Sequence, residues 1–256
     1  MDYQTLDCDE RDGIITVTVT RPAARNALSR LTLTELHHLL SGLTTPMILT
    51  GSAGPAFVAG ADIREMAAMT PEEGEEFGRL GQAVTSLLES VPVPVIACVD
   101  GYALGGGCEI AMACDFVYAT EKSVFGQPEV LLGLIPGFGG CVRLQQLVGP
   151  ARAREMIYSG RQADAAEAHR IGLVNAIFDS RDAMLAAARG TLATIRQNSP
   201  AAVSLCKAAI NAARCQDVQS GLQIELAAFR QAFTTPDMRE GTAAFLAKRQ
   251  PAFHRA

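Results

Sequence analysis

Apolar residues along the chain form short runs that alternate with longer stretches of helical periodicity. Runs typical of buried strands cover residues 14–19, 47–50, 93–99, 116–119 and 173–178. Helical segments separate most of them, and strands that alternate with helices form parallel sheets. The pattern therefore predicts an α/β protein with a largely buried parallel sheet.

Several helix starts are marked by a capping residue followed by proline at the first helical position. This pair occurs at Thr70-Pro71, where Glu73 completes a capping box, and at Ser199-Pro200 and Thr235-Pro236. Beyond residue 195 no strand-like run remains. The pattern predicts three helices in residues 196–256.

Composition and charge narrow the class of protein. The 256 residues are 48% hydrophobic and 19% charged, and no apolar run approaches the roughly 20 residues of a membrane span. The acidic start Met1-Asp2 does not resemble a signal peptide. A net charge of −5 argues against a general nucleic-acid or membrane-surface binder. We expect a soluble cytoplasmic protein.

Several kinds of site are excluded by missing motifs. The seven cysteines show no C-x-x-C spacing, which favours reduced core thiols over a zinc site or a disulfide framework. No G-x-S-x-G segment accompanies the four histidines, so a serine nucleophile is not expected. The glycine stretches also fail the phosphate-loop and dinucleotide fingerprints. We expect no metal, ATP or NAD.

The segment 101–113 carries the strongest chemical signal. Gly105, Gly106 and Gly107 lead into the apolar run 110–113, which predicts a loop entering a helix whose unpaired amides can hold an oxyanion. Glu109 is surrounded by apolar residues and is expected to be buried, which catalysis would explain. The alternative is an ordinary turn followed by a capping or solvated carboxylate.

A second carboxylate, Glu129, follows in the segment 125–129, and its alternative interpretation is a polar turn. These segments and four other motifs occur in the order and at the spacing typical of the enoyl-CoA hydratase/isomerase (crotonase) family. The chain resembles this family over nearly its whole length. The motifs are Arg21-Pro22 with Asn26-Ala27-Leu28, Phe57 to Ile63, the glycine stretch, Phe125 to Glu129, Leu134 to Gly140, and Gly172-Leu173-Val174.

The resemblance implies a fold and an assembly. The fold is the crotonase spiral of repeated ββα units, with an acyl-CoA site in a core of residues 1–195. The C-terminal helical region, 196–256, would cover the active site and join subunits into trimers or a dimer of trimers. Apolar positions such as Phe229, Phe233 and Phe245 recur at helical spacing there, and the alternative is that they pack within their own domain.

The resemblance also implies an activity. Acidic residues at both Glu109 and Glu129 are typical of the hydratase branch, which adds water reversibly across a 2-enoyl-CoA double bond to give a 3-hydroxyacyl-CoA. In the family the Glu129 position usually delivers the proton and the Glu109 position activates water, although the sequence alone does not assign these roles. The alternatives are a hydratase of branched or carboxylated acyl-CoA (methylglutaconyl-CoA type), an enoyl-CoA isomerase, or a silent CoA-binding or RNA-binding homologue.

The remaining site residues follow from the same resemblance. The oxyanion hole is expected at the backbone amides of Ala61 and Gly106, and Asp62 and Glu65 show capping-box spacing beside Ala61. Coenzyme A is part of the substrate, and no separate cofactor is expected. Its contacts are expected at Ala59, Ala61, Asp62, Ile63, Arg64 and Arg25, and at Lys248 of a neighbouring chain. Arg25 and Lys248 could equally be solvated charges.

The chain departs from the family pattern in two places. Residues 31–46 are shorter than the usual first helix and its connection, which predicts a truncated first helix at one edge of the acyl pocket. Cys141 stands where many members have Thr or Ser, and we expect this to cost only a weak capping hydrogen bond.

Overall fold

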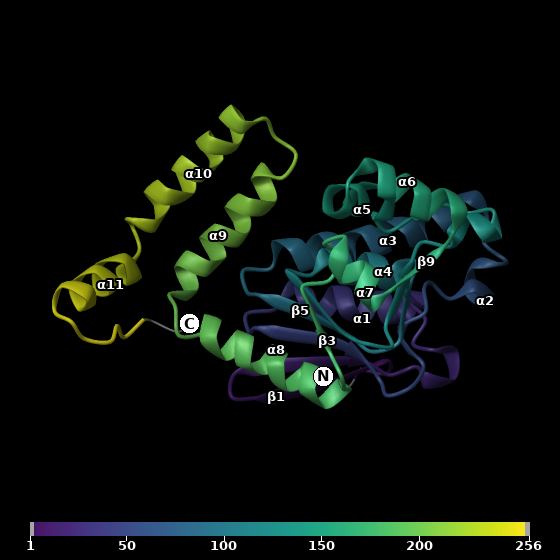
Figure 1. The fold of residues 1–256 in the computed structure, drawn as a ribbon, viewed down its shortest axis with the longest axis horizontal. Coiled ribbons are helices and arrows are strands. Elements are labelled where there is room, and N and C mark those ends of the chain that lie inside the picture. The colour runs from purple at the N-terminus through teal and green to yellow at the C-terminus, as the bar shows by residue number, and fades with distance from the viewer. Residues whose placement is uncertain (1–2, 254–256) are drawn as a thin grey trace.

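The structure, a computed structural model, describes residues 3–253 as two sheets surrounded by helices (Figure 1). The larger sheet has six strands in the order β1-β2-β3-β5-β7-β10, all parallel except the antiparallel β1–β2 pair. This confirms the expected α/β class with a mostly parallel sheet. Its strands are β1 (Leu6–Arg11), β2 (Ile14–Val19), β3 (Met47–Gly51), β5 (Val95–Val99), β7 (Phe116–Thr120) and β10 (Ala176–Phe178).

The smaller sheet has the order β4-β6-β8-β9, with only β8–β9 antiparallel. Its strands are β4 (Ala56–Val58), β6 (Tyr102–Leu104), β8 (Val124–Gly126) and β9 (Gln162–Asp164). Three times the chain runs from a strand of the larger sheet to one of the smaller sheet and then into a helical segment. The expected spiral of ββα units is therefore confirmed.

Helices cover both faces of the larger sheet (Figure 1). Ser29 caps α1 by accepting from Thr32, so the short segment after residue 30 still forms a 12-residue helix. Thr70 and Glu73 form the expected capping box at the start of α3. The helices up to the C-terminal region are α1 (Arg30–Ser41), α2 (Ile63–Met66), α3 (Pro71–Ser90), α4 (Gly106–Ala113), α5 (Gly140–Val148), α6 (Pro150–Ser159), α7 (Ala165–Arg170) and α8 (Arg181–Ile195), with 3-10 turns η1 (Pro22–Ala24) and η2 (Glu129–Leu132).

Two predicted strands start later than the sequence pattern indicates. Strand β5 begins at Val95, after Pro94, which has no amide hydrogen to donate to a ladder. Strand β10 begins at Ala176, because the amides of Leu173 and Val174 both donate to the carbonyl of Ala168 and so close the end of α7. Apolar content alone does not show that an amide is already used by a helix end.

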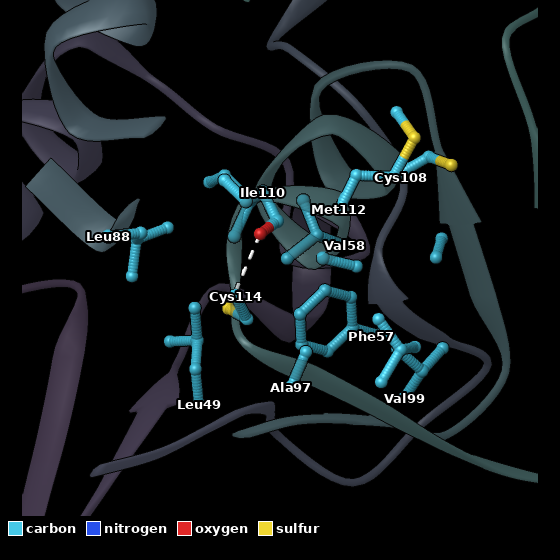
Figure 2. Close-up of a cluster of buried hydrophobic side chains, with 14 of the residues drawn as sticks. Leu49, Phe57, Val58, Leu88, Ala97, Val99, Cys108, Ile110, Met112 and Cys114 are labelled. Atoms are coloured by element: carbon cyan, nitrogen blue, oxygen red, sulfur yellow. Dashed lines mark hydrogen bonds between the residues drawn. The ribbon is translucent and has the colours of Figure 1, made fainter. Parts of the chain in front are cut away.

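Helix α4 is fixed by packing on all sides. Every residue from Gly106 to Ala113 is buried, and Figure 2 shows Ile110 and Met112 among side chains of the core such as Phe57. The Cys114 thiol closes the helix end by donating to the Ile110 carbonyl at 3.4 Å (Figure 2). Burying one such apolar side chain stabilises the fold by roughly 1.5–3 kcal/mol. The carboxylate on this helix is therefore held on a rigid element.

The C-terminal region forms the three predicted helices, α9 (Pro200–Ala213), α10 (Val218–Ala232) and α11 (Pro236–Leu246). Ser199 and Thr235 cap α9 and α11 as expected. Helix α9 is fastened to the core by the buried Lys207, which donates to the Leu88 and Val93 carbonyls and to Asp115. Helices α10 and α11 project away from the two sheets (Figure 1).

Candidate functional site

Three parallel strands of the smaller sheet end at one edge and bring the predicted site residues together. Strand β6 pairs with β4 on one side and with β8 on the other. Ala61 follows the end of β4, Gly106 follows β6, and Glu129 follows β8. Because the carboxyl ends of parallel strands share one edge, residues far apart in the sequence meet there, as ligand sites of α/β sheets commonly do.

The glycine stretch is required by close backbone packing. Gly105 has φ 49° and ψ −123°, a conformation that side chains rarely adopt. A Cβ atom on Gly107 would lie 2.0 Å from the Val58 carbonyl oxygen of the neighbouring strand. A larger residue at Gly107 would push the start of α4 away from β4, and one at Gly105 would strain the backbone and collide with the Glu129 carboxyl group.

The amides of Ala61 and Gly106 are both unused. Among the described residues, neither N–H donates a hydrogen bond to the backbone or to a side chain. Gly106 is the first residue of α4, where an amide has no partner within the helix and the helix dipole is positive. Unpaired amides of this kind can bind a negatively charged oxygen.

Glu109 lies in the first turn of α4 and is 1% exposed, which confirms its expected burial. Its Oε1 atom accepts hydrogen bonds from the amides of Phe138 at 2.8 Å and Gly140 at 2.6 Å. Burial raises the pKa of Glu109 to about 7, although these amides and the charge of Arg143 oppose the rise. The backbone of Gly139 also favours the ionised form, more weakly than the amides of Phe138 and Gly140.

Glu129 begins the 3-10 turn η2 and approaches the same glycine loop. A Cβ atom on Gly105 would lie 2.8 Å from Glu129 Oε1. Burial raises the pKa of Glu129 to about 7, and the negative charge of Glu109 adds to the rise. The buried Gln127 amide, oriented so that both its polar atoms have partners, donates to Glu129 Oε1 at 3.0 Å. The carboxyl groups of Glu109 and Glu129 therefore influence each other's ionisation.

The residues expected to contact coenzyme A gather beside Ala61. The amide of Ala59 donates to the carbonyl of Arg25 at 3.1 Å, which brings these two segments together. Ile63 and Arg64 are exposed on α2, whereas Asp62 is half-buried and pairs with Arg21 at 2.9 Å. Burial raises the pKa of Asp62, but the hydrogen bond and charge of Arg21 outweigh this effect and hold it below its usual value.

The expected capping box of Asp62 and Glu65 does not form. The Asp62 side chain caps α2 by accepting from Arg64, but the Asp62 amide donates to the Leu28 carbonyl. Glu65 instead accepts from the amide of Arg30 at 2.9 Å, at the start of α1. The spacing was correct for a box, but a tertiary contact takes the carboxylate.

The structure also places Lys248 and Cys141, for which the sequence predicted a coenzyme A contact and a weakened helix cap. Lys248 follows α11, which lies at the opposite end of the molecule from α2, so within one chain it does not join the other expected coenzyme A contacts (Figure 1). Cys141 is the second residue of α5, whose N-cap is Gly139, and its thiol lies 4.0 Å from the Pro136 carbonyl. It does not cap this helix.

Four residues of the site were not singled out by the sequence. Phe138 and Gly140 supply the amides on Glu109, Gln127 lies against Glu129, and Arg143 donates to the Phe138 carbonyl. The first three lie within the family-like motifs, but no local pattern in the sequence gives them a role. Gly139, with φ 111°, was the available signal that the backbone before α5 turns toward another group.

Residues 3–253 contain neither a cluster of metal-ligating side chains nor a helix that could span a membrane. No group of three or more His, Cys, Asp or Glu side chains is placed to hold a metal ion. None of the described helices combines the length and the apolar character needed to cross a bilayer.

Comparisons with known proteins agree with the geometry. The model of the enoyl-CoA hydratase/isomerase family matches residues 9–256. A crotonyl-CoA hydratase of Syntrophomonas wolfei is 42% identical over 99% of this chain and 99% of its own length. A short-chain-enoyl-CoA hydratase of Clostridium acetobutylicum is 44% identical over 98% of this chain and 97% of its own length. The crystal structure of an enoyl-CoA hydratase from Bacillus anthracis, 36% identical, matches with a TM-score of 0.93 over 99% of this chain and 100% of its own. The chain belongs to the enoyl-CoA hydratase/isomerase family.

Proposed function

We propose that Glu109 and Glu129 hydrate a 2-enoyl-CoA thioester while the amides of Ala61 and Gly106 hold its carbonyl oxygen. The observation that carries this proposal is the meeting of two carboxyl groups of raised pKa with two unpaired amides at one sheet edge. Negative charge builds on the thioester oxygen as water adds, and preorganised donors stabilise that charge. One such donor is worth roughly 3–4 kcal/mol of the barrier.

The surroundings of the two carboxyl groups favour different protonation states. Glu109 Oε1 accepts two amide hydrogen bonds, which stabilise the ionised form, so Glu109 is the base that takes a proton from water. Glu129 is raised in pKa by burial and by the charge of Glu109, so it carries the proton. Hydroxide adds to the β-carbon and Glu129 protonates the α-carbon. The proton taken by Glu109 replaces the one that Glu129 gave, so one water is consumed.

The enzyme class expected from the sequence, an enoyl-CoA hydratase and hence a lyase, is confirmed by the family match and the hydratase relatives. The alternatives of an isomerase, a hydratase of branched or carboxylated acyl-CoA and a silent homologue are not favoured by these relatives. Because two of them are named for crotonyl-CoA and short-chain enoyl-CoA, we propose a short acyl chain for this enzyme. The proposed chemistry uses only side chains and backbone and needs no added cofactor.

Coenzyme A is proposed to lie along Ala59, Ala61, Asp62, Ile63 and Arg64, with Arg25 as a phosphate contact. These residues adjoin the unpaired Ala61 amide, and the exposed Arg25 offers positive charge there. Lys248 would act in the site of a neighbouring chain.

We also propose that the C-terminal helices join subunits into trimers or a dimer of trimers in the cytoplasm. In the single chain Phe229, Phe233 and Phe245 are 61%, 52% and 82% exposed, more apolar surface than a monomer usually leaves in water. Such an assembly would bring Lys248 near another subunit's site.

The function is tested with crotonyl-CoA, whose loss of enoyl ultraviolet absorbance reports hydration, and with mass spectrometry of the product. Saturated butyryl-CoA serves as the matched ligand that binds without reacting. A panel of longer, branched and carboxylated enoyl-CoAs then sets the acyl preference. Absence of hydration across the whole panel, or movement of the double bond without water uptake, contradicts the proposal.

A further inference from the structure

We propose that Arg143 is a positioning residue for Glu109, acting through the backbone of Phe138, and that Glu89 moderates the effect of the Arg143 charge on Glu109. This inference rests on the proposed catalytic role of Glu109. Arg143 lies on α5 and is 9% exposed, and it touches neither carboxyl group of the site directly.

The backbone of Phe138 connects Arg143 to Glu109. Its amide donates to Glu109 Oε1 at 2.8 Å, and its carbonyl accepts from Arg143 Nη1 at 3.0 Å and from Thr85 Oγ1 at 2.9 Å. The residue is therefore held from both sides. Rotation of this segment would turn the Phe138 amide away from Glu109 and release its carboxylate.

Gly139 allows this contact. A Cβ atom at Gly139 would lie 2.0 Å from Arg143 Nη1, so the guanidinium packs against bare backbone. The left-handed φ of 111° at Gly139 also lets the amides of Phe138 and Gly140 converge on one carboxylate oxygen. The loop before α5 is built around Arg143 on one side and Glu109 on the other.

Glu89 of α3 orients the guanidinium and balances its charge. Its two oxygens accept from Arg143 Nε at 2.9 Å and Nη2 at 2.6 Å, a two-pronged pair of the kind that fixes the guanidinium plane. Glu89 also pairs with Arg214, the C-cap residue of α9. The C-terminal helical region therefore contacts the same charge network as the catalytic carboxylate.

The charge of Arg143 favours the ionised form of Glu109 against the effect of burial. The other titratable groups that face Glu109 are Glu129 on η2 and the thiols of Cys108 on α4 and Cys141 on α5. Arg143 is thus the cation that acts on Glu109, and from α3 Glu89 partly neutralises it. Removal of Arg143 and removal of the Glu89 charge should have opposite effects on the ionisation of Glu109.

The test compares Arg143→Gln with Glu89→Gln in the pH dependence of kcat for crotonyl-CoA. Arg143→Gln should lower kcat about 10-fold to 100-fold, as small misplacements of catalytic groups do, with KM nearly unchanged. It should also move the acidic limb of the profile to higher pH. Glu89→Gln leaves the Arg143 charge unbalanced, so its acidic limb should move to lower pH. Arg143→Lys keeps the positive charge but loses the guanidinium geometry. Its acidic limb should therefore lie close to that of the wild type, while its kcat stays lower.

Arg161→Gln is the matched control, because Arg161 also pairs with two carboxylates, Glu155 and Glu167, outside the site. It should lower thermal stability without changing the pH profile. If the Arg143→Gln variant does not fold, the Glu89→Gln and Arg143→Lys profiles still decide. Acidic limbs that stay at the wild-type pH, or that move in the same direction in the Arg143→Gln and Glu89→Gln variants, overturn the proposal. An active Glu109→Gln variant would instead refute the role of Glu109 itself.

Discussion

The amide of Gly140 donates to Glu109 Oε1 at 2.6 Å, so the first turn of α5 faces the first turn of α4. Glu109 therefore lies between the positive ends of two helices. Each end favours the ionised carboxylate and partly offsets the burial that raises its pKa to about 7. This arrangement suits a group that must take a proton near neutral pH and then return it.

The first prediction concerns the two carboxyl groups. Glu109→Gln and Glu129→Gln should each lower kcat by roughly 10² to 10⁴ while the affinity for butyryl-CoA stays nearly unchanged. The glutamine carbonyl at position 109 can still accept the Phe138 and Gly140 amides, so the loop should stay folded. The absorbance of crotonyl-CoA measures the rate. A variant that keeps more than about a tenth of the wild-type rate contradicts the assignment.

The second prediction concerns stability and pH. The pKa of Glu129 is raised from 4.5 to about 7, so between these values the folded state binds more protons than the unfolded state, and stability falls as pH rises. Glu129→Gln removes this loss. The melting temperature of the variant minus that of the wild type should therefore increase by a few degrees from pH 4 to pH 8. Most of this increase should fall between about pH 4.5 and pH 7.

Glu155→Gln is the control for this measurement. Arg161 holds the pKa of Glu155 below its usual value, so removal of this carboxylate should cost stability increasingly as pH rises. The two variants should give slopes of opposite sign. A flat slope for Glu129→Gln, or one with the same sign as the Glu155→Gln slope, would mean that the pKa of Glu129 is not raised in the folded protein.

The third prediction isolates one oxyanion donor. Gly106→Pro removes the amide hydrogen at the first position of α4, where proline is compatible with a helix. Gly106→Ala keeps the amide and adds the same Cβ atom, which would lie 3.0 Å from the Phe138 ring and 3.1 Å from Leu28. The proline variant should lose roughly 10²-fold to 10³-fold more kcat than the alanine variant.

Circular dichroism and thermal melting decide whether the Gly106 comparison is valid. The two variants must melt at similar temperatures for the difference in rate to report on the amide. Equal rates in two folded variants would remove the Gly106 amide from the mechanism.

The fourth prediction concerns the attachment of α9. Lys207 is 8% exposed and donates to Leu88, Val93 and Asp115, so Lys207→Met leaves a half-buried carboxylate and two carbonyls without this partner. Breaking a buried pair typically costs about 3–5 kcal/mol. Urea unfolding should show a loss of this order, and Lys207→Met with Asp115→Asn should recover part of it. An unchanged urea midpoint would show that α9 is held by other contacts.

Features that depend on residues nearby in the sequence could be predicted, such as the burial of Glu109. Contacts between residues far apart in the sequence could not. Glu109 could be predicted to be buried because its own helix is apolar. The amides of Phe138 and Gly140 reach it across 29 and 31 positions, and no local pattern records that contact. The same reason explains Glu65, whose spacing fits a capping box but whose carboxylate serves Arg30.

Gly107 touches no part of the proposed chemistry, yet a Cβ atom there would lie 2.0 Å from the Val58 carbonyl. In a library that randomises every position and selects for growth on an enoyl-CoA precursor, variants at Gly107 should be depleted as severely as variants at Glu109. Purified variants separate the two, since Glu109→Gln should yield folded protein without turnover and Gly107→Val should yield little folded protein. A genetic screen of this enzyme therefore reports the fit between β4 and α4 as strongly as it reports catalysis.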